Sequence, residues 1–156
     1  MSEAIAPELH SVWQRLQAMR SNLTHATLLY GASGEGKTNL AQYFAKSILC
    51  MNQKAKVPCN ICRSCHLFEL GHHPGMHQLH SEGGAIKIDM VRGLAATLHT
   101  TVTIGREKVI VINPLENLNH NAANAMLKLL EEPPPHTYAA PHPGPPCHML
   151  PLLRVA

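Results

Sequence analysis

The segment GASGEGKT, from Gly31 to Thr38, constrains the fold of this chain more than any other part of the sequence. It matches the pattern G-x-x-x-x-G-K-[ST], in which glycines let backbone N–H groups turn toward a phosphate and the following helix directs its positive end to the same point. An apolar run precedes it and a helical pattern follows it, so the sequence predicts a strand, a phosphate-binding loop and a helix in succession. The residues assigned to nucleotide binding are Gly31, Gly34, Gly36, Lys37 and Thr38.

Binding is better supported than hydrolysis. The pattern places Lys37 on the β- and γ-phosphates and Thr38 on Mg²⁺. Hydrolysis also needs an acidic residue at the end of a later apolar strand, and there the chain has Asn113 and Pro114. Glu116 is close in sequence, but its direction after Pro114 is not fixed by the pattern. We therefore assign no catalytic residue and expect binding of ATP with Mg²⁺ and little turnover.

The rest of the chain alternates between helical and strand-like patterns, which predicts an α/β fold with a largely parallel sheet. Asp89 is the expected N-cap of the third helix, and Pro133 stops the last one. Helices are expected at 9–19, 39–49, 90–101 and 119–132, and strands at 26–30, 76–81 and 108–112.

The last stretch, 139–156, is proline-rich and has no usable periodicity. Such a composition is typical of a disordered segment. We expect one domain over residues 1–138, followed by a disordered tail over 139–156.

Four cysteines form a second pattern, with the spacing C-x8-C-x2-C-x2-C. Four thiolates in a tetrahedron are a common structural zinc site, and such a site is closed and non-catalytic. The predicted ligands are Cys50, Cys59, Cys62 and Cys65, within a zinc module over about residues 50–73. A metal can order a poorly periodic insertion without a large core.

Two alternatives to zinc stay open at this point: an iron–sulfur cluster, which also uses thiolates, and unpaired buried cysteines. His66, His72 and His73 are nearby, but four thiolates already satisfy a zinc ion. Cys147 lies in the tail without a partner at metal-binding spacing.

The composition and net charge of the chain exclude few further classes of protein. The net charge of +3 is too small to indicate nucleic-acid binding by itself. The N-terminus has no signal-peptide pattern, and no apolar run has the length of a membrane helix. We expect a cytoplasmic protein, and in that reducing compartment clustered cysteines favour a metal over disulfides.

Four segments together resemble the bacterial DNA polymerase III clamp-loader family, within the AAA+ ATPases. They cover most of residues 12–138, in the family's order, and the stretch AANAMLKLLEEPP is the most specific. Because Asn113 and Pro114 stand where gamma and tau subunits have an acidic pair, the resemblance is greatest to the delta-prime group. The four segments are HATLLYGASGEGKTNLAQYFAKSILC, PCNICRSCHLFELGHHPGMHQLH, IKIDMVRGL and REKVIVINPLENLNHNAANAMLKLLEEPPPHT.

The resemblance implies a P-loop AAA+ domain with a zinc-binding insertion, in a machine that uses ATP to load a sliding clamp onto primed DNA. The implied partners are the delta and gamma/tau subunits and, through the complex, the clamp and DNA. Two alternatives are a fragment of a gamma/tau-type ATPase and an independent small P-loop NTPase or kinase. The combination of a four-cysteine insertion and an LLEEPP helix in one chain argues against a small kinase, which has no reason to carry both.

The chain departs from the family in two places. Gly75 replaces a usual aspartate, from which we expect a small local effect. After Tyr138 the family's next apolar strand, its S-R-C arginine, its lid and its collar domain are not recognisable, so we expect a truncated or frameshifted chain that does not support clamp loading. We also expect the strands at 26–30 and 108–112 to lack their shared hydrogen-bond partner, which is costly for buried backbone groups.

Overall fold

The computed structural model describes residues 5, 7–20, 26–29, 35–52, 58–81, 83–100, 103–105, 107–131, 137–140 and 150–154. Gly31, Gly34 and Cys147, which figure in the sequence predictions, lie outside these ranges.

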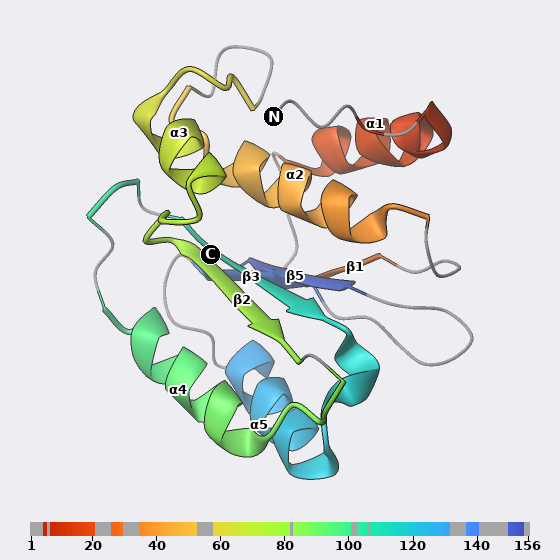
Figure 1. The fold of residues 1–156 in the computed structure, drawn as a ribbon, viewed down its shortest axis with the longest axis vertical. Helices are drawn as coiled ribbons and strands as arrows, with labels where there is room; N and C mark the ends of the chain where they lie inside the picture. Colours follow the sequence, from red (N-terminus) through yellow and green to blue (C-terminus); the bar gives the residue numbers. More distant parts are fainter. Residues whose placement is uncertain are drawn as a thin grey trace.

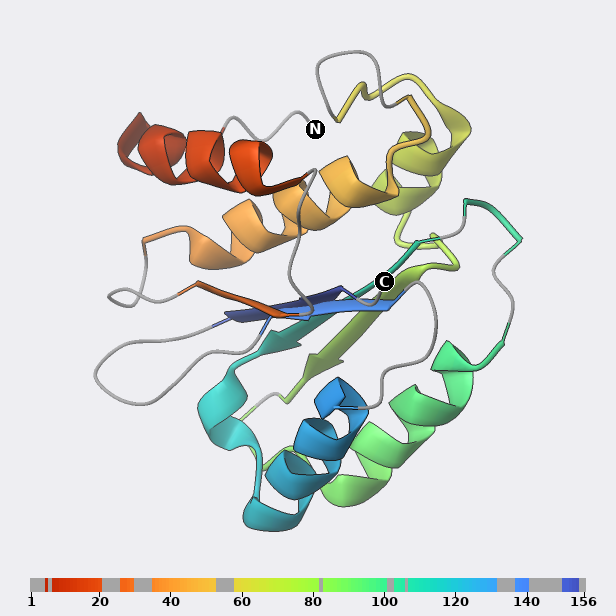
Figure 2. The same ribbon diagram turned by 180° about the vertical axis from the view of Figure 1, so that it is seen from behind.

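A five-stranded sheet forms the middle layer of the fold, and helices cover both of its faces (Figures 1 and 2). The strand order is β1-β5-β4-β3-β2, and β3 runs parallel to both β2 and β4. The strands are β1 (Ala26–Leu29), β2 (Met76–His80), β3 (Lys108–Asn113), β4 (Thr137–Ala140) and β5 (Leu150–Arg154). The predicted α/β class and the three predicted strands are confirmed.

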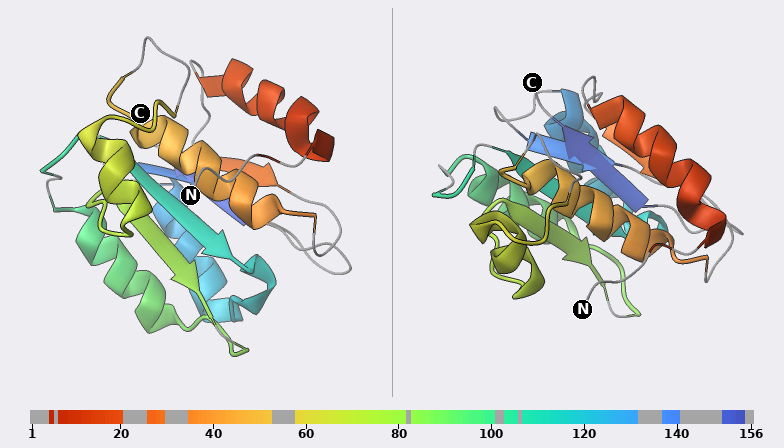
Figure 3. Two further views of the ribbon diagram at one scale, coloured as in Figure 1. Left: turned by 45° about the horizontal axis from the view of Figure 1, so that its top comes forward. Right: turned by 90° about the horizontal axis from the view of Figure 1, so that it is seen from above.

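The helices divide between the two faces of the sheet. Helices α1 and α2 lie on one face, with α3 beyond the end of α2, whereas α4 and α5 cover the other (Figures 1 and 3). The bounds are α1 (His10–Met19), α2 (Lys37–Leu49), α3 (Arg63–Glu69), α4 (Ile88–Leu98) and α5 (His120–Glu131), with short 3-10 turns at η1 (Pro7–Leu9) and η3 (Leu115–Asn117).

The apolar strand β3 connects two hydrophobic cores. Its side chains alternate between the faces of the sheet, so Val109 and Val111 join the core under α1 and α2, while Ile110 and Ile112 join the core under α4 and α5. Burial on both faces explains why this strand is continuously apolar. On the first face, Trp13 of α1 packs edge-on against Tyr43 of α2, with ring centroids 4.9 Å apart.

The predicted N-cap at Asp89 is wrong. Helix α4 begins at Ile88, and the extended Lys87 occupies the cap position without a side-chain cap bond. Asp89 lies in the first turn instead, where a carboxylate is favourable beside the helix N-terminus. At α5 the cap is conventional, since Asn119 Oδ1 accepts a hydrogen bond from the N–H of Ala122 at 2.8 Å.

The expectation that β1 and β3 lack a shared partner is wrong. Strand β4 pairs in parallel with β3, with Lys108 opposite Thr137, and also pairs with β1 at Ala26 and Ala139. Strand β5 then runs antiparallel to both β1 and β4. The physical reason is that backbone hydrogen bonds do not depend on side-chain identity, and β4, which contains no proline, supplies N–H and C=O groups to its neighbours.

The proline-rich last stretch includes residues in strand conformation. Within 139–156, residues 139–140 belong to β4 and residues 150–154 to β5, while the expected disorder of the tail stays a prediction. Pro151 lies opposite Leu28 and has no N–H to donate to the ladder. The proposed domain boundary after residue 138 falls inside β4, and the division of the chain into domain and tail remains a prediction.

Gly75 has more than a minor local role in this backbone. It precedes β2, and its carbonyl accepts a hydrogen bond from the N–H of Val109 at 2.7 Å. A Cβ atom at Gly75 would clash with the carbonyl oxygen of Glu107. An aspartate here would require the β2–β3 backbone to move, so the glycine allows these two strands to approach closely.

Within the described residues, we find no helix that combines the length and the apolar character needed to span a membrane.

Candidate metal centre and nucleotide-binding loop

One helix connects the two sites that the sequence predicts. Helix α2 begins at Lys37, inside the glycine-rich motif, and ends at Leu49, after which Cys50 turns into an extended conformation. At 1.5 Å per residue its 13 residues span about 20 Å. The phosphate-binding motif and the cysteine cluster therefore lie at opposite ends of one rigid element.

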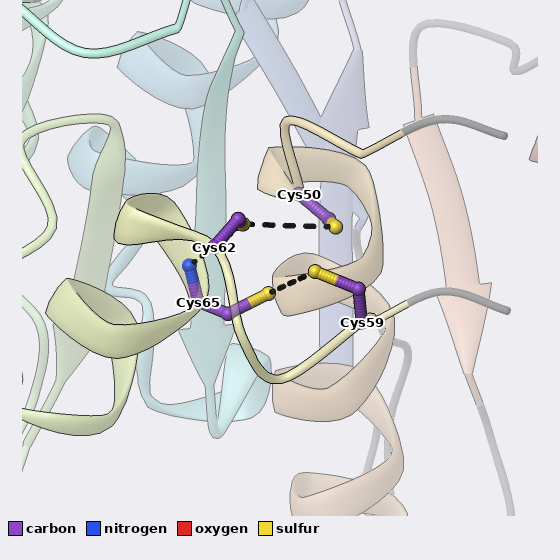
Figure 4. Close-up of side chains that lie close together, drawn as sticks. All are labelled: Cys50, Cys59, Cys62 and Cys65. Atoms are coloured by element: carbon purple, nitrogen blue, oxygen red, sulfur yellow. Dashed lines mark hydrogen bonds between the residues drawn. The ribbon is translucent and has the colours of Figure 1, made fainter. Parts of the chain in front are cut away.

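The structure brings the four predicted cysteines together. Their sulfur atoms all lie within 4.8 Å of one another. The Sγ atoms of Cys50 and Cys62 are 4.0 Å apart, as are those of Cys59 and Cys65 (Figure 4). A tetrahedral zinc ion with Zn–S bonds of about 2.3 Å separates its sulfurs by about 3.8 Å. The cluster has the donor type, number and spacing that such an ion requires.

The local backbone explains how the ligands converge. Cys62 is the N-cap of α3, and its Sγ accepts a hydrogen bond from the N–H of Cys65 at 3.4 Å. Asn60 adopts a left-handed conformation with φ of 59°, which turns the chain between Cys59 and Cys62. Cys50 and Cys65 are buried, while Cys59 and Cys62 are partly exposed.

The four thiols differ in how readily they ionise without a metal. Burial raises the pKa of Cys50 and of Cys65. Burial also opposes ionisation of Cys62, but the N–H groups of Cys65 and Met51 outweigh it and lower the pKa of Cys62 to about 6. A bound divalent cation removes the protons from its thiol ligands. The thiols of Cys50 and Cys65 are thus harder to ionise than that of Cys62, and a bound divalent cation would favour the ionised form of all of them.

A buried lysine attaches the cysteine module to α2. Lys46 is only 6% exposed. Its Nζ donates to Asn60 Oδ1 at 2.6 Å and forms an ion pair with Glu69 Oε1 at 2.5 Å. The hydrogen bond from Lys46 lowers the pKa of Glu69. The cysteine loop and α3 are thus both held to α2 by one charge.

His73 holds a second polar connection rather than a metal. The Ser64 hydroxyl donates to the Leu49 carbonyl at 2.5 Å and lies 2.9 Å from His73 Nε2. The N–H of Gly75 donates to His73 Nδ1 at 3.0 Å. The end of α2, the start of α3 and the start of β2 are thereby joined. In the described part of the chain, the candidate metal-binding group comprises the four cysteines and includes no histidine.

We expect this connection to weaken in acid. Because Nδ1 accepts a hydrogen bond, His73 is held neutral, and burial followed by the neighbouring His77 lowers the pKa of His73. In the folded protein the pKa of His73 lies below its value of about 6.5 in the unfolded chain, so the unfolded state takes up a proton more readily. The stabilisation that neutral His73 provides is therefore complete above about pH 6.5 and is lost as the pH falls through the folded-state pKa. Urea unfolding between about pH 7 and pH 5 should show this loss in the wild type, and His73→Gln should show a shallower pH dependence.

The control for this experiment is His80→Gln, the same change at an exposed position of β2. It should retain the pH dependence of the wild type. An equal pH dependence in His73→Gln and the wild type would show that His73 does not contribute.

At the other end of α2, the described part of the nucleotide-binding loop has the predicted backbone. Gly36 is the N-cap of α2 with φ of 72°, a left-handed conformation that favours glycine. The side chain of Lys37 is 8% exposed, and its Nζ lies 3.9 Å from Glu35 Oε2. The structure thus confirms the loop-to-helix turn at Gly36 and Lys37.

Thr38 contacts a residue that is distant in sequence. Asn113 lies at the end of β3, and its Nδ2 donates to Thr38 Oγ1 at 3.3 Å. The end of β3 is where an acidic residue would be needed for hydrolysis, and the structure places a neutral amide there. Glu116 lies exposed on η3, and its role in hydrolysis stays untested.

Sequence reasoning missed three of these contacts: Asn113 with Thr38, Glu35 with Lys37, and Lys46 with the cysteine module. Only the contact between Asn113 and Thr38 could have been anticipated from the sequence. The carboxyl ends of parallel strands meet at one edge of a sheet, and this rule could have placed the residue after the apolar run 108–112 near the loop that follows 26–29.

The class of the protein follows from three features: a mixed sheet with a parallel β2–β3–β4 core covered on both faces, a glycine-rich turn leading into α2, and four converging cysteines at the far end of that helix. Together they define a P-loop α/β domain with a cysteine module. Comparison with known proteins agrees with this class. The sequence model of the family described as "DNA polymerase III, delta subunit" matches residues 6–151. The chain belongs to the DNA polymerase III clamp-loader family, in its delta-prime group.

Individual relatives support that assignment. The chain is 37% identical to DNA polymerase III subunit delta' of Pseudomonas aeruginosa over 96% of its own length and 46% of the relative's. It is 36% identical to subunit delta' of Bacillus subtilis, over 77% of the chain and 36% of the relative. DNA polymerase III subunit tau of Escherichia coli is 33% identical over 72% of the chain and 17% of its own length. The chain therefore spans less than half the length of these relatives.

Proposed function

We propose that this chain is a delta-prime-type subunit of the DNA polymerase III clamp loader, a complex that loads the sliding clamp onto primed DNA in the cytoplasm with the use of ATP. The expectation that the 156-residue form by itself does not support loading stays a prediction. The observation that carries the proposal is helix α2, which joins the nucleotide-binding motif at Lys37 to the cysteine cluster at Cys50. The similar delta' and tau proteins are all named as DNA polymerase III subunits, which supports the same assignment.

The proposed nucleotide is ATP. Its phosphates would be held by the backbone of the glycine-rich loop and by Lys37, whose buried ammonium group supplies a positive charge at the start of α2. The loop residues in this proposal are Gly31, Gly34, Gly36, Lys37 and Thr38. Because Asn113 is neutral and contacts Thr38, we propose that the chain binds nucleotide and hydrolyses little of it.

The proposed metal is zinc, with a structural role. Cys50, Cys59, Cys62 and Cys65 would be its ligands, and four protein thiolates leave no open position for a substrate. When bound, zinc supplies a fixed cross-link between the end of α2 and the start of α3. The chain's own residues, Lys46 and Ser64, hold the same two elements together.

The proposed partners are the delta and gamma/tau subunits, and through them the clamp and primed DNA. Zinc-loaded chain titrated into each purified subunit from the same organism should show saturable binding to at least one of them by sedimentation or interferometry. An unrelated P-loop NTPase of similar size serves as the control. Saturable binding to none of these subunits would contradict the proposed role in the complex.

A further inference from the structure

The contact between Asn113 and Thr38 alters the place where a nucleotide-bound Mg²⁺ would be held. Thr38 is the residue that the motif assigns to this ion, and Asn113 Nδ2 donates to its hydroxyl oxygen at 3.3 Å. The two residues come from the start of α2 and the end of β3. Both are part of the proposed nucleotide site, and the inference below depends on that proposal.

The donor set at this point does not suit Mg²⁺. Magnesium is a hard cation that prefers oxygen ligands and is usually bound through one or two carboxylates together with substrate phosphates. The side chain of Asn113 is a carboxamide, which is neutral whichever way it is turned. In the observed contact it also occupies a lone pair of the Thr38 hydroxyl oxygen, the atom that would face the ion.

The positive charge needed by the phosphates is supplied without a metal. Lys37 is buried at the N-terminus of α2, where the backbone N–H groups and the helix dipole favour an anion. The nearby Glu35 carboxylate is 52% exposed and lies 3.9 Å from Lys37 Nζ. An incoming phosphate can replace this exposed carboxylate as the counter-ion of Lys37.

We infer that this chain binds adenine nucleotide without a divalent cation, through Lys37 and the helix N-terminus, and that Asn113 is the residue that removes the requirement for Mg²⁺. The nucleotide phosphates take the position opposite Lys37, and Asn113 keeps the Thr38 hydroxyl as a neutral hydrogen-bonding group.

The test is equilibrium binding of a fluorescent ADP or ATP analogue to the full chain, once with Mg²⁺ and once with excess EDTA. The wild-type dissociation constant should change by less than about twofold between the two buffers. Binding that is present with Mg²⁺ and lost in EDTA overturns this inference but leaves the proposed nucleotide site in place. Absence of binding in both buffers overturns the nucleotide site and this inference together.

Substitution of Asn113 tests whether this residue controls the requirement for Mg²⁺. Asn113→Asp should weaken binding in EDTA, because the new carboxylate repels the phosphates, and should restore it with Mg²⁺, giving a difference between the buffers of about tenfold or more. Asn124→Asp is the matched control, since it adds the same charge at an exposed position of α5 and should behave as the wild type in both buffers. Equal behaviour of Asn113→Asp and Asn124→Asp would show that Asn113 does not control the metal requirement.

A second variant covers the case in which Asn113→Asp fails to fold, as judged by circular dichroism. Thr38→Ala removes the hydroxyl and should weaken binding by the same factor with Mg²⁺ and with EDTA. A loss of affinity confined to the Mg²⁺ buffer would mean that Thr38 holds the ion, and would overturn the inference.

Discussion

Replacing Cys62 with serine is expected to release zinc from the protein and to unfold the cysteine module. A serine hydroxyl is a poor substitute for a thiolate, and Cys62 is both a proposed ligand and the N-cap of α3. Changing an outer-shell partner of a metal ligand already costs about 10- to 100-fold in affinity, and loss of a ligand should cost more. Metal affinity in such small modules is also folding free energy, so α3 should lose its order with the ion.

Elemental analysis of the purified chain should give about one zinc per wild-type molecule and almost none for Cys62→Ser. Cys147→Ser is the matched control, because it removes the one cysteine outside the cluster and should keep the metal. Nucleotide binding should survive in both variants, since the two sites lie at opposite ends of α2. Iron with visible absorbance, or no metal in the wild type, would contradict the zinc assignment.

Replacing Lys37 with alanine is expected to abolish measurable nucleotide binding. Lys37 supplies a buried positive charge at the start of α2, and hydrogen bonds to charged groups are each worth about 1.5–3 kcal/mol. Its loss should weaken the affinity by about 10- to 100-fold or more, which places binding below the range of a typical titration. The fold should persist, because Lys37 is the first residue of α2 and the apolar face of that helix is unchanged.

Equilibrium binding of a fluorescent ATP analogue measures this effect, with Lys128→Ala as the control at an exposed lysine of α5. The control should bind as the wild type does. An unchanged dissociation constant in Lys37→Ala would show that the loop does not use its lysine. Robust ATP turnover by the wild type, lost in Lys37→Ala, would instead show that Glu116 or another acid replaces the missing carboxylate.

The sequence by itself determined the features that depend on local order. The apolar run 108–112 could only be a buried strand in this context, and the glycine-rich motif before a helical pattern fixed the turn at Gly36. The cysteine spacing likewise identified the members of the cluster, because two overlapping C-x2-C turns present Cys59, Cys62 and Cys65 at metal-binding separation and Cys50 follows the preceding helix. Each of these signals lies within a few residues of the structure that it specifies.

Tertiary structure decided what lies beside these elements. Asn113 meets Thr38 across 75 residues, and Lys46 is buried only because the cysteine loop and α3 fold over it. The proline-rich stretch forms β5 because neighbouring strands offer backbone partners that its composition does not reveal. Periodicity and spacing record local preference, whereas these contacts depend on how distant segments pack, and no local pattern carries that information.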